Sequence, residues 1–409
     1  MSSEVLVIGG GAAGMFAAVT AAREGAQVTL LERGNRLGRK LSITGKGRCN
    51  VCNDVSPREV IQNIPRNGKF LSSALYAFPP ESVKSFFEQQ GVPLKTERGN
   101  RVFPESDQAG DIVGALKTAL YRSNVRIVTG RASKLFVENG AVHGVLLEDG
   151  SRLPFSKVIL ATGGLSYPLT GSTGDGYAMA ISAGHTVTPC EGSLVPLEER
   201  GGWCRRMQGL SLRNVGLRLL ADGKTVYEDF GELLFTHFGL SGPTILSASA
   251  HMREKASYQV QIDLKPALDE AALDTRVLRD FSSQQNRILL HAVSGLYPSA
   301  MIPVIIEKSG LDPEKRIHDL TRNERLALEK ETKAFTIDIL GKRPVEEAII
   351  TTGGVEPREI DPRSMESRLC SGLYFAGEII DADAYTGGFN LQIAWSTAYL
   401  AGRAAAKGE

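Results

Sequence analysis

The residues whose types and spacing could do chemistry begin near the N-terminus, with three glycines and one acid. Gly9, Gly11 and Gly14 form a G-x-G-x-x-G, and Glu32 follows the last glycine by eighteen residues. In such a turn the first glycine permits a sharp bend, the second lets a pyrophosphate approach the backbone, and the third lets a helix pack closely on a strand. A carboxylate placed like Glu32 can accept both hydroxyls of an adenosine ribose. The pattern predicts a dinucleotide-binding turn.

The elements that must position these residues can be read on either side of the glycines. Residues 5–8 are a continuous apolar run, typical of a strand buried on both faces, and residues 15–23 read as a helix that stops at Gly25. A second strand over residues 27–31 delivers Glu32 at its carboxyl end. The start of the helix offers unpaired N–H groups to a pyrophosphate. Because an acid at position 32 would repel a 2′-phosphate, the choice is between NAD and FAD.

A cationic, glycine-rich segment over residues 33–48 favours FAD. It contains no acid and six cations: Arg33, Arg36, Arg39, Lys40, Lys46 and Arg48. In a simple NAD dehydrogenase the second strand would lead into another helix, whereas a long loop of this kind suits an extended cofactor. Its charge could neutralise the pyrophosphate and the negative charge of a reduced flavin ring, with Lys46 and Arg48 as the candidates for the ring. The alternative is a solvated basic loop, which Gly45 and Gly47 disfavour because they let backbone N–H groups face an anion.

Three later segments also predict a close approach of backbone to cofactor. A buried strand ends in Ala161-Thr162-Gly163, and a second strand ends in Gly377-Glu378, whose acid could hold a ribityl hydroxyl. The helix of residues 391–406 begins after Gly388-Phe389-Asn390, so its N–H groups could face the flavin pyrimidine. Asp175 lies at the start of another helix and could cap it.

Several blocks of sequence together resemble one known family. GRKLSITGKGRCN (residues 38–50) is similar to a signature of the BaiN-like, or aminoacetone-oxidase-like, family of bacterial FAD-dependent oxidoreductases, within the glutathione-reductase-like flavoproteins. Further blocks in family order occupy residues 101–116, 159–180, 232–246 and 374–398. Cys52, Ala384 and Phe389 stand where threonine, glycine and tyrosine are usual, and none of these departures touches the glycine fingerprint.

The residues expected to contact FAD follow from the motifs and from this resemblance. They are Gly9, Gly11, Ala12, Ala13, Gly14, Glu32, Arg33, Gly38, Arg39, Lys40, Thr44, Gly45, Gly47, Cys49, Asn50, Ala161, Thr162, Gly163, Asp175, Gly377, Glu378, Gly388, Phe389, Asn390 and Leu391. His237 is a candidate for proton transfer, because a histidine can titrate near neutral pH, and its alternative is a structural role in a turn.

The predicted fold class is α/β, with a Rossmann-like FAD-binding domain that contains an antiparallel β-meander over residues 131–155. We expect this domain to comprise residues 1–190 and 352–409. Residues 191–351 are expected to form an inserted β-barrel domain for substrate, with a helical subdomain over about residues 266–333. The meander prediction rests on alternating apolar residues around two turns, Asn139-Gly140 and Asp149-Gly150.

Composition narrows the function classes. With 47 basic and 46 acidic side chains the formal charge is +1, so we expect no nucleic-acid or membrane partner. Five cysteines suit a reducing compartment, and with no signal-peptide pattern the expected location is cytoplasmic. Cys49 and Cys52 form a C-x-x-C that could be a redox pair, but we interpret them as ordinary reduced thiols. No metal site is predicted.

The resemblance implies hydride exchange between N5 of FAD and a small organic molecule, bound between the flavin face and the insert. It leaves two reactions open: reduction of an activated C=C bond using reduced nicotinamide, or oxidation of an amine using oxygen. Since the chain has no second G-x-G-x-x-G, NAD(P)H would dock only transiently. The alternatives are a tRNA-modifying flavoprotein and a non-catalytic flavin sensor. The oligomeric state is left open.

Overall fold

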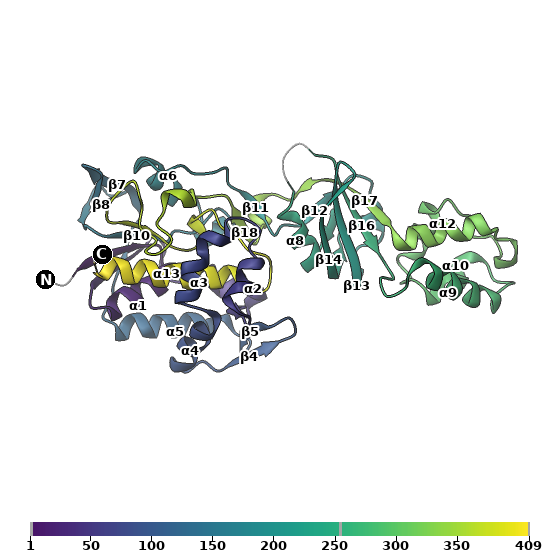
Figure 1. Ribbon diagram of the computed structural model, residues 1–409, viewed down its shortest axis with the longest axis horizontal. Helices are drawn as coiled ribbons and strands as arrows, with labels where there is room; N and C mark the ends of the chain where they lie inside the picture. The colour runs from purple at the N-terminus through teal and green to yellow at the C-terminus, as the bar shows by residue number, and fades with distance from the viewer. Residues whose placement is uncertain (1–2, 253–255, 408–409) are drawn as a thin grey trace. The chain divides into compact units, whose positions relative to one another are not determined.

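The computed structural model describes residues 3–252 and 256–407. These residues divide into two compact units (Figure 1). The first contains the described residues up to Ser193 together with those from Val345 onward, and the second runs from Leu194 to Pro344. No helix in the described part of the chain is long and apolar enough to cross a membrane.

A five-stranded parallel sheet forms the centre of the first unit, with strand order β19-β10-β1-β2-β6. Its strands are β1 (Glu4–Ile8), β2 (Gln27–Glu32), β6 (Arg126–Thr129), β10 (Val158–Leu160) and β19 (Leu373–Phe375). The middle strands are apolar on both faces, and Val5 to Val7 are completely buried, as a parallel sheet covered on both sides requires. The predicted Rossmann-like arrangement is confirmed.

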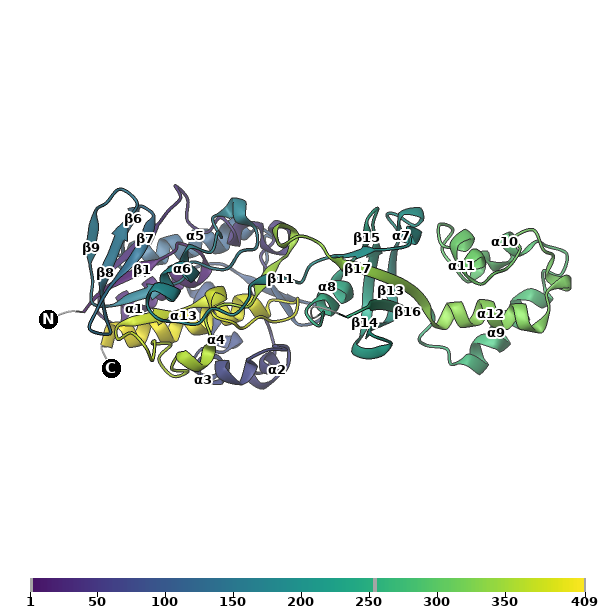
Figure 2. The ribbon, with the colours of Figure 1, turned by 90° about the horizontal axis from the view of Figure 1, so that it is seen from above.

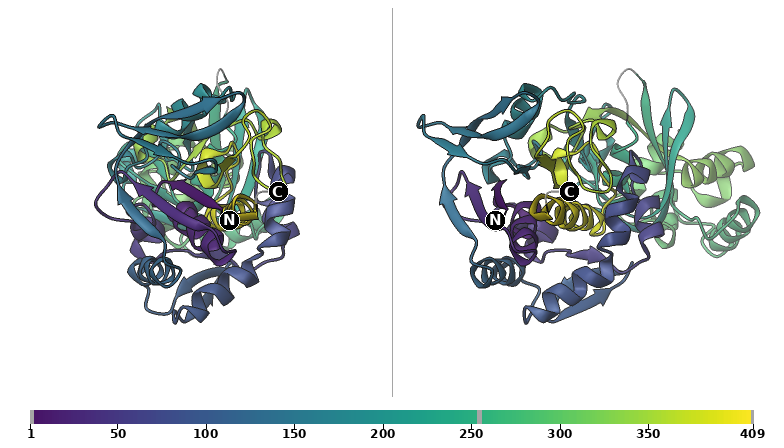
Figure 3. Two further views of the ribbon diagram at one scale, coloured as in Figure 1. Left: turned by 90° about the vertical axis from the view of Figure 1, so that its left-hand side faces the viewer. Right: turned by 60° about the vertical axis from the view of Figure 1, so that its left-hand side comes forward.

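Two helices from opposite ends of the chain pack together against this sheet. They are α1 (Ala12–Arg23) and α13 (Phe389–Lys407), which lie side by side in Figure 3. A Cβ atom on Gly402 would lie 2.6 Å from the carbonyl oxygen of Ala17, so only glycine allows the helix backbones to approach this closely. The last helix of the chain is thereby fixed against the helix that begins at the glycine-rich turn.

Smaller elements surround the sheet of the first unit. The predicted meander is confirmed as β7 (Ala132–Glu138), β8 (Ala141–Leu147) and β9 (Arg152–Pro154). A second small sheet consists of β3 (Cys52–Asn53), β4 (Leu94–Glu97) and β5 (Arg101–Pro104). The helices are α2 (Pro57–Gln62), α3 (Ser72–Ala77), α4 (Pro80–Gln89), α5 (Ala109–Arg122) and α6 (Asp175–Ser182).

The chain leaves and re-enters the first unit through a pair of short antiparallel strands, β11 (Glu191–Ser193) and β18 (Ile350–Thr352). Because residues 191–351 are the expected insert, its two expected boundaries fall at β11 and within β18. In the structure these two strands pair with each other, with Gly192 opposite Thr351, and not with the barrel.

The second unit is built on a closed barrel with strand order β12-β15-β14-β13-β16-β17. The strands are β12 (Leu197–Glu199), β13 (Ser211–Ala221), β14 (Lys224–Phe235), β15 (Gly239–Ser241), β16 (Tyr258–Asp263) and β17 (Phe335–Lys342). Side chains along β16 alternate between buried and half-buried, as expected when one face fills the barrel. The predicted β-barrel is confirmed.

Helices of the second unit lie between β16 and β17 in the chain, where the helical subdomain was predicted (Figure 2). They are α9 (Glu270–Ser282), α10 (Leu289–Ala292), α11 (Ile302–Lys308) and α12 (Arg322–Lys333), while the shorter α7 (Trp203–Arg206) and α8 (Pro243–Ser249) precede β16. A capping box at Thr321 and Glu324 starts α12. Val277 of α9 and Leu328 of α12 belong to the same apolar core as the barrel interior.

Candidate functional site

The glycine-rich turn between β1 and α1 has the geometry of an anion site. Gly9 has a φ of 107°, and a Cβ there would lie 2.5 Å from the carbonyl oxygen of Ala161. A Cβ on Gly14 would lie 1.7 Å from the carbonyl oxygen of Gly9. Gly11 differs from both: it is the N-cap of α1, no side chain caps the helix, and a Cβ there would meet nothing within 4 Å. The start of α1 therefore combines unpaired N–H groups with free space beside Gly11, which fits the pyrophosphate of FAD.

Glu32 lies at the end of β2 beside this turn. Its Oε2 accepts a hydrogen bond of 2.6 Å from Gly10 N, and its Oε1 accepts one of 2.7 Å from Gly34 N. Each carboxylate oxygen retains a lone pair for a ribose hydroxyl. The backbone thus fixes the orientation of the acid, as a hydroxyl-binding carboxylate requires.

Asp175 lies near Arg33, the residue that follows Glu32. It does not cap α6, whose N-cap is Gly174, so the capping alternative is wrong. Arg131 donates two hydrogen bonds to its carboxylate, of 2.8 and 2.9 Å, and Arg33 Nη1 donates one of 3.0 Å. The bonds from Arg131 lower the pKa of the Asp175 carboxyl below its usual value. Asp175 therefore holds Arg33 in place next to Glu32, and its direct contact with the cofactor stays a prediction.

Lys40 and Glu378, both predicted cofactor residues, form an ion pair with 2.6 Å between Lys40 Nζ and Glu378 Oε2. The same Nζ donates to Ser166 Oγ at 2.7 Å, while Glu378 Oε1 accepts from Ser166 Oγ at 2.9 Å and from Thr351 N at 2.9 Å. The pair is mostly buried, with exposed side-chain fractions of 22% for Lys40 and 15% for Glu378. Glu378 thus joins the cationic loop, the loop after β10 and strand β18.

The cationic loop adopts a backbone that favours glycine at several positions. Gly45, Lys46 and Gly47 have φ angles of 57°, 59° and 84°, and the side chain of Lys46 is exposed. Gly38 N donates to Gly10 O at 2.8 Å, which ties the loop to the glycine-rich turn. Asn50 Oδ1 is buried and has no hydrogen-bond partner within the described structure. An unpartnered buried acceptor is costly, so this atom fits a site that a ligand donor completes.

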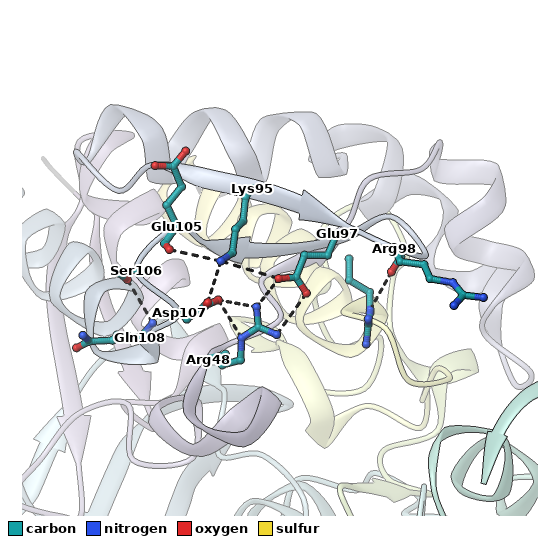
Figure 4. Close-up of polar contacts among 9 residues, drawn as sticks. Arg48, Lys95, Glu97, Arg98, Glu105, Ser106, Asp107 and Gln108 are labelled. Atoms are coloured by element: carbon teal, nitrogen blue, oxygen red, sulfur yellow. Dashed lines mark hydrogen bonds and ion pairs between the residues drawn. The ribbon is translucent and has the colours of Figure 1, made fainter. Parts of the chain in front are cut away.

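Arg48 lies beside Glu97 at the end of β4 and Asp107 between β5 and α5 (Figure 4). It forms ion pairs with Glu97 and Asp107, and its guanidinium carbon lies 4.1 Å from the ring centroid of Phe103. Hydrogen bonds from Arg48 lower the pKa of Glu97, and those from Lys95 and then Arg48 lower the pKa of Asp107. The charge of Arg48 is therefore balanced locally, and its influence on a flavin remains a prediction.

The C-terminal segment brings its glycines against α1 and β3. A Cβ on Gly377 would lie 2.7 Å from the Cβ of Ala13, and one on Gly388 would lie 2.4 Å from the carbonyl oxygen of Cys52. Asn390 accepts from Ala384 N at 2.8 Å and donates to Ala384 O at 2.8 Å. Predicted cofactor residues from the beginning, middle and end of the chain thus gather within the first unit.

The cysteines and histidine named from the sequence have simple surroundings. Cys49 and Cys52 are free and buried, and burial raises the pKa of Cys49 to about 12 and that of Cys52 further. Thiols that stay protonated are poor redox nucleophiles, which favours the interpretation as ordinary reduced thiols.

His237 lies exposed between β14 and β15 in the second unit, with its ring edge-on to Phe238 at 5.0 Å. No group of three or more metal-ligating side chains is present among the described residues.

Sequence reasoning missed a polar cluster next to Glu378. Asp381 and Asp383 are 2% and 1% exposed, and they contact Arg66, Thr352 and Ser193. The only available signal was two acids in an otherwise apolar stretch, IIDADA, directly after Gly377-Glu378.

Comparison with known proteins identifies the family. The family described as "HI0933-like protein Rossmann domain" matches residues 3–404. The 3-dehydro-bile acid delta(4,6)-reductase of Clostridium scindens is 32% identical over 98% of this chain and 98% of its own length. The ribosomal RNA dihydrouridine synthases of Haemophilus influenzae and Escherichia coli are 32% and 30% identical over 97% of this chain, covering 97% and 96% of their own lengths.

A solved structure supports the fold independently. The 3-ketosteroid delta1-dehydrogenase of Sterolibacterium denitrificans superposes with a TM-score of 0.52, at 12% identity and 99% coverage of both chains. At that identity the likeness concerns the fold alone. The family match over nearly the whole chain carries the assignment: this protein belongs to the HI0933-like Rossmann family and is an FAD-dependent oxidoreductase.

Proposed function

We propose that this protein saturates a carbon–carbon double bond conjugated with a carbonyl group, using NAD(P)H as a transiently bound donor. The observation that carries the proposal is near-full-length similarity to relatives of two names, a 3-dehydro-bile acid delta(4,6)-reductase and ribosomal RNA dihydrouridine synthases. Both names describe saturation of a C=C bond conjugated with a carbonyl. Oxidation of an amine appears in the name of a more distant relative, the L-aspartate oxidase of Saccharolobus solfataricus, which is 25% identical over 65% of this chain and 60% of its own length.

The residues of the first unit supply a site for the cofactor of this reaction. The open start of α1 at Gly11 would hold the pyrophosphate, Glu32 the adenosine ribose and Glu378 a ribityl hydroxyl. When bound, FAD supplies hydride transfer through N5. Lys40 keeps Glu378 oriented and balances its charge. The start of α13 at Phe389 would offer its N–H groups to negative charge on the reduced flavin.

The test is an anaerobic reduction and re-oxidation experiment. The purified holoprotein is mixed with NADH, NADPH or a panel of amines while the flavin absorbance is followed. We expect bleaching by a reduced nicotinamide, and re-oxidation by unsaturated 3-oxo steroids or simple cyclic enones faster than by oxygen. Bleaching by an amine, followed by fast re-oxidation with oxygen only, would overturn the proposal in favour of an amine oxidase.

A second candidate is reduction of uracil rings in ribosomal RNA. The two dihydrouridine synthases favour it, since each matches nearly the full length of this chain. The near-neutral charge of +1 argues against a broad RNA-binding surface. The two candidates separate when dihydrouridine is measured in ribosomal RNA fragments incubated with the reduced enzyme, in parallel with the enone assay.

A further inference from the structure

Two buried acids lie in the loop that joins two proposed flavin-binding segments. This loop, residues 380–388, connects the 3₁₀ turn η8 (Gly377–Ile379) to the start of α13. Asp381 is 2% exposed and Asp383 is 1% exposed. Asn390 holds the loop through its two hydrogen bonds of 2.8 Å to Ala384, the residue next to Asp383. The loop is therefore fixed to the same helix start that we assign to the flavin pyrimidine.

Arg66 forms an ion pair with Asp381, and its positive charge also lowers the pKa of Asp383. Arg66 Nη2 lies 2.9 Å from Asp381 Oδ2, and Arg66 Nη1 donates to Thr352 Oγ1 at 3.1 Å. Asp383 instead accepts from two hydroxyls, Thr352 Oγ1 at 2.8 Å and Ser193 Oγ at 2.9 Å. Two carboxyls thus share one cation, and the second is surrounded by neutral donors.

These surroundings accommodate both protonation states of Asp383. A hydroxyl can donate to a carboxylate or accept from a protonated carboxyl, so a proton on Asp383 Oδ2 finds an acceptor in Ser193 Oγ. Burial raises the pKa of Asp383, and the hydrogen bonds from Thr352 and Ser193 and the charge of Arg66 oppose this effect. The negative charge of Asp381 raises the pKa of Asp383 further. β11 and β18 each provide one hydroxyl to Asp383, from Ser193 and Thr352. Tyr177 and Cys190 interact with the charge of Asp381. Burial raises the pKa of both groups, so both stay neutral.

We propose that Asp383 is a redox-linked proton acceptor, which takes up one proton when bound FAD receives two electrons. The inference rests on the proposed function, since it requires flavin beside the start of α13. Reduction by NAD(P)H or dithionite delivers two electrons and one proton to the isoalloxazine, which gains negative charge. That charge raises the energy of the nearby Asp383 carboxylate, so a second proton enters from solvent, which the cluster meets at the 45% exposed side chain of Arg66. The neutral carboxyl then stabilises the reduced flavin.

The test is potentiometry of the holoprotein between pH 5 and 9, with dithionite as reductant and a reference dye. Each proton taken up with two electrons contributes about 30 mV per pH unit, because a tenfold change in concentration is 29.6 mV for a two-electron couple. We expect a range of pH in which the slope doubles to about 60 mV in the wild-type protein. This range should disappear in Asp383→Asn and return in Asp383→Glu. Glu138→Gln, a change of an exposed acid on the meander, should leave the wild-type profile unchanged.

Three results would overturn the inference. The first is a wild-type slope of about 30 mV per pH unit at every pH, which decides the matter even when Asp383→Asn does not fold. The second is a doubled slope that persists in Asp383→Asn. The third is a doubled slope that coincides with the absorbance change of protonation at flavin N1. Failure of the proposed function is distinct, since a protein without bound FAD gives no flavin potential at all.

Discussion

The glycine-rich turn and the Glu378–Asp383 segment solve the same problem in different ways. At the turn, backbone atoms form the proposed pyrophosphate site, and its geometry requires glycine at positions 9 and 14, where a Cβ would collide with backbone. At Glu378, side chains and backbone from distant segments converge, with Lys40 separated from it by 338 positions. The proposed cofactor site therefore combines a local motif with a network assembled by folding. The two should respond to mutation differently.

The largest effect is expected at Gly14. In Gly14→Val the new side chain would collide with the carbonyl oxygen of Gly9, since a Cβ alone lies 1.7 Å from it. Overpacking against backbone costs about 1–3 kcal/mol or more, so we expect a lower melting temperature and loss of FAD. Gly11→Ala is the matched comparison, because its Cβ has open space. It should keep the melting temperature of the apoprotein and weaken only FAD binding. Equal apoprotein stability of the two variants would contradict the comparison.

Glu32→Arg should come next. It replaces two ribose-hydroxyl contacts with a cation, and hydrogen bonds to a charged group contribute about 1.5–3 kcal/mol each. We expect the dissociation constant for FAD to rise by about 100-fold or more, measured by fluorescence titration of the apoprotein. Unchanged FAD occupancy would show that the ribose lies elsewhere.

A smaller loss is expected when the network at Glu378 is broken. Lys40→Met leaves the mostly buried Glu378 carboxylate without its cation, and we expect FAD affinity to fall about tenfold, or about 1.4 kcal/mol. Lys69→Met, a change of an exposed lysine, is the control. If both variants bind FAD equally, Lys40 has no positioning role.

The smallest effect concerns the pH dependence at Asp175. Its pKa is lowered in the folded protein, so its ion pairs add stability above the unfolded pKa near 4, and this stability is lost as the pH falls through the lower folded value. Asp175→Asn should therefore lower the melting temperature at pH 7, with a difference from wild type that shrinks below about pH 4. A difference that stays constant with pH would contradict this origin.

The same contrast explains what could be predicted from the sequence. The strand, glycines, helix and acid of residues 5–32 are adjacent in the chain, so spacing alone defines them. The hydrogen bond between Ser193 and Asp383 joins residues 190 positions apart, and no local sequence motif predicts a contact over that separation. Asp175 reads locally as a helix cap, yet Arg131 and Arg33 bind its carboxylate in the folded protein. Tertiary contacts override local preference in such cases.

Every role proposed above requires bound FAD, so the central test is the flavin content of the gently purified protein. The residues gathered around Gly11, Glu32 and Glu378 predict a yellow protein that retains, or takes up from solution, one FAD per chain. A correctly folded protein that is colourless and does not bind added FAD would contradict the account.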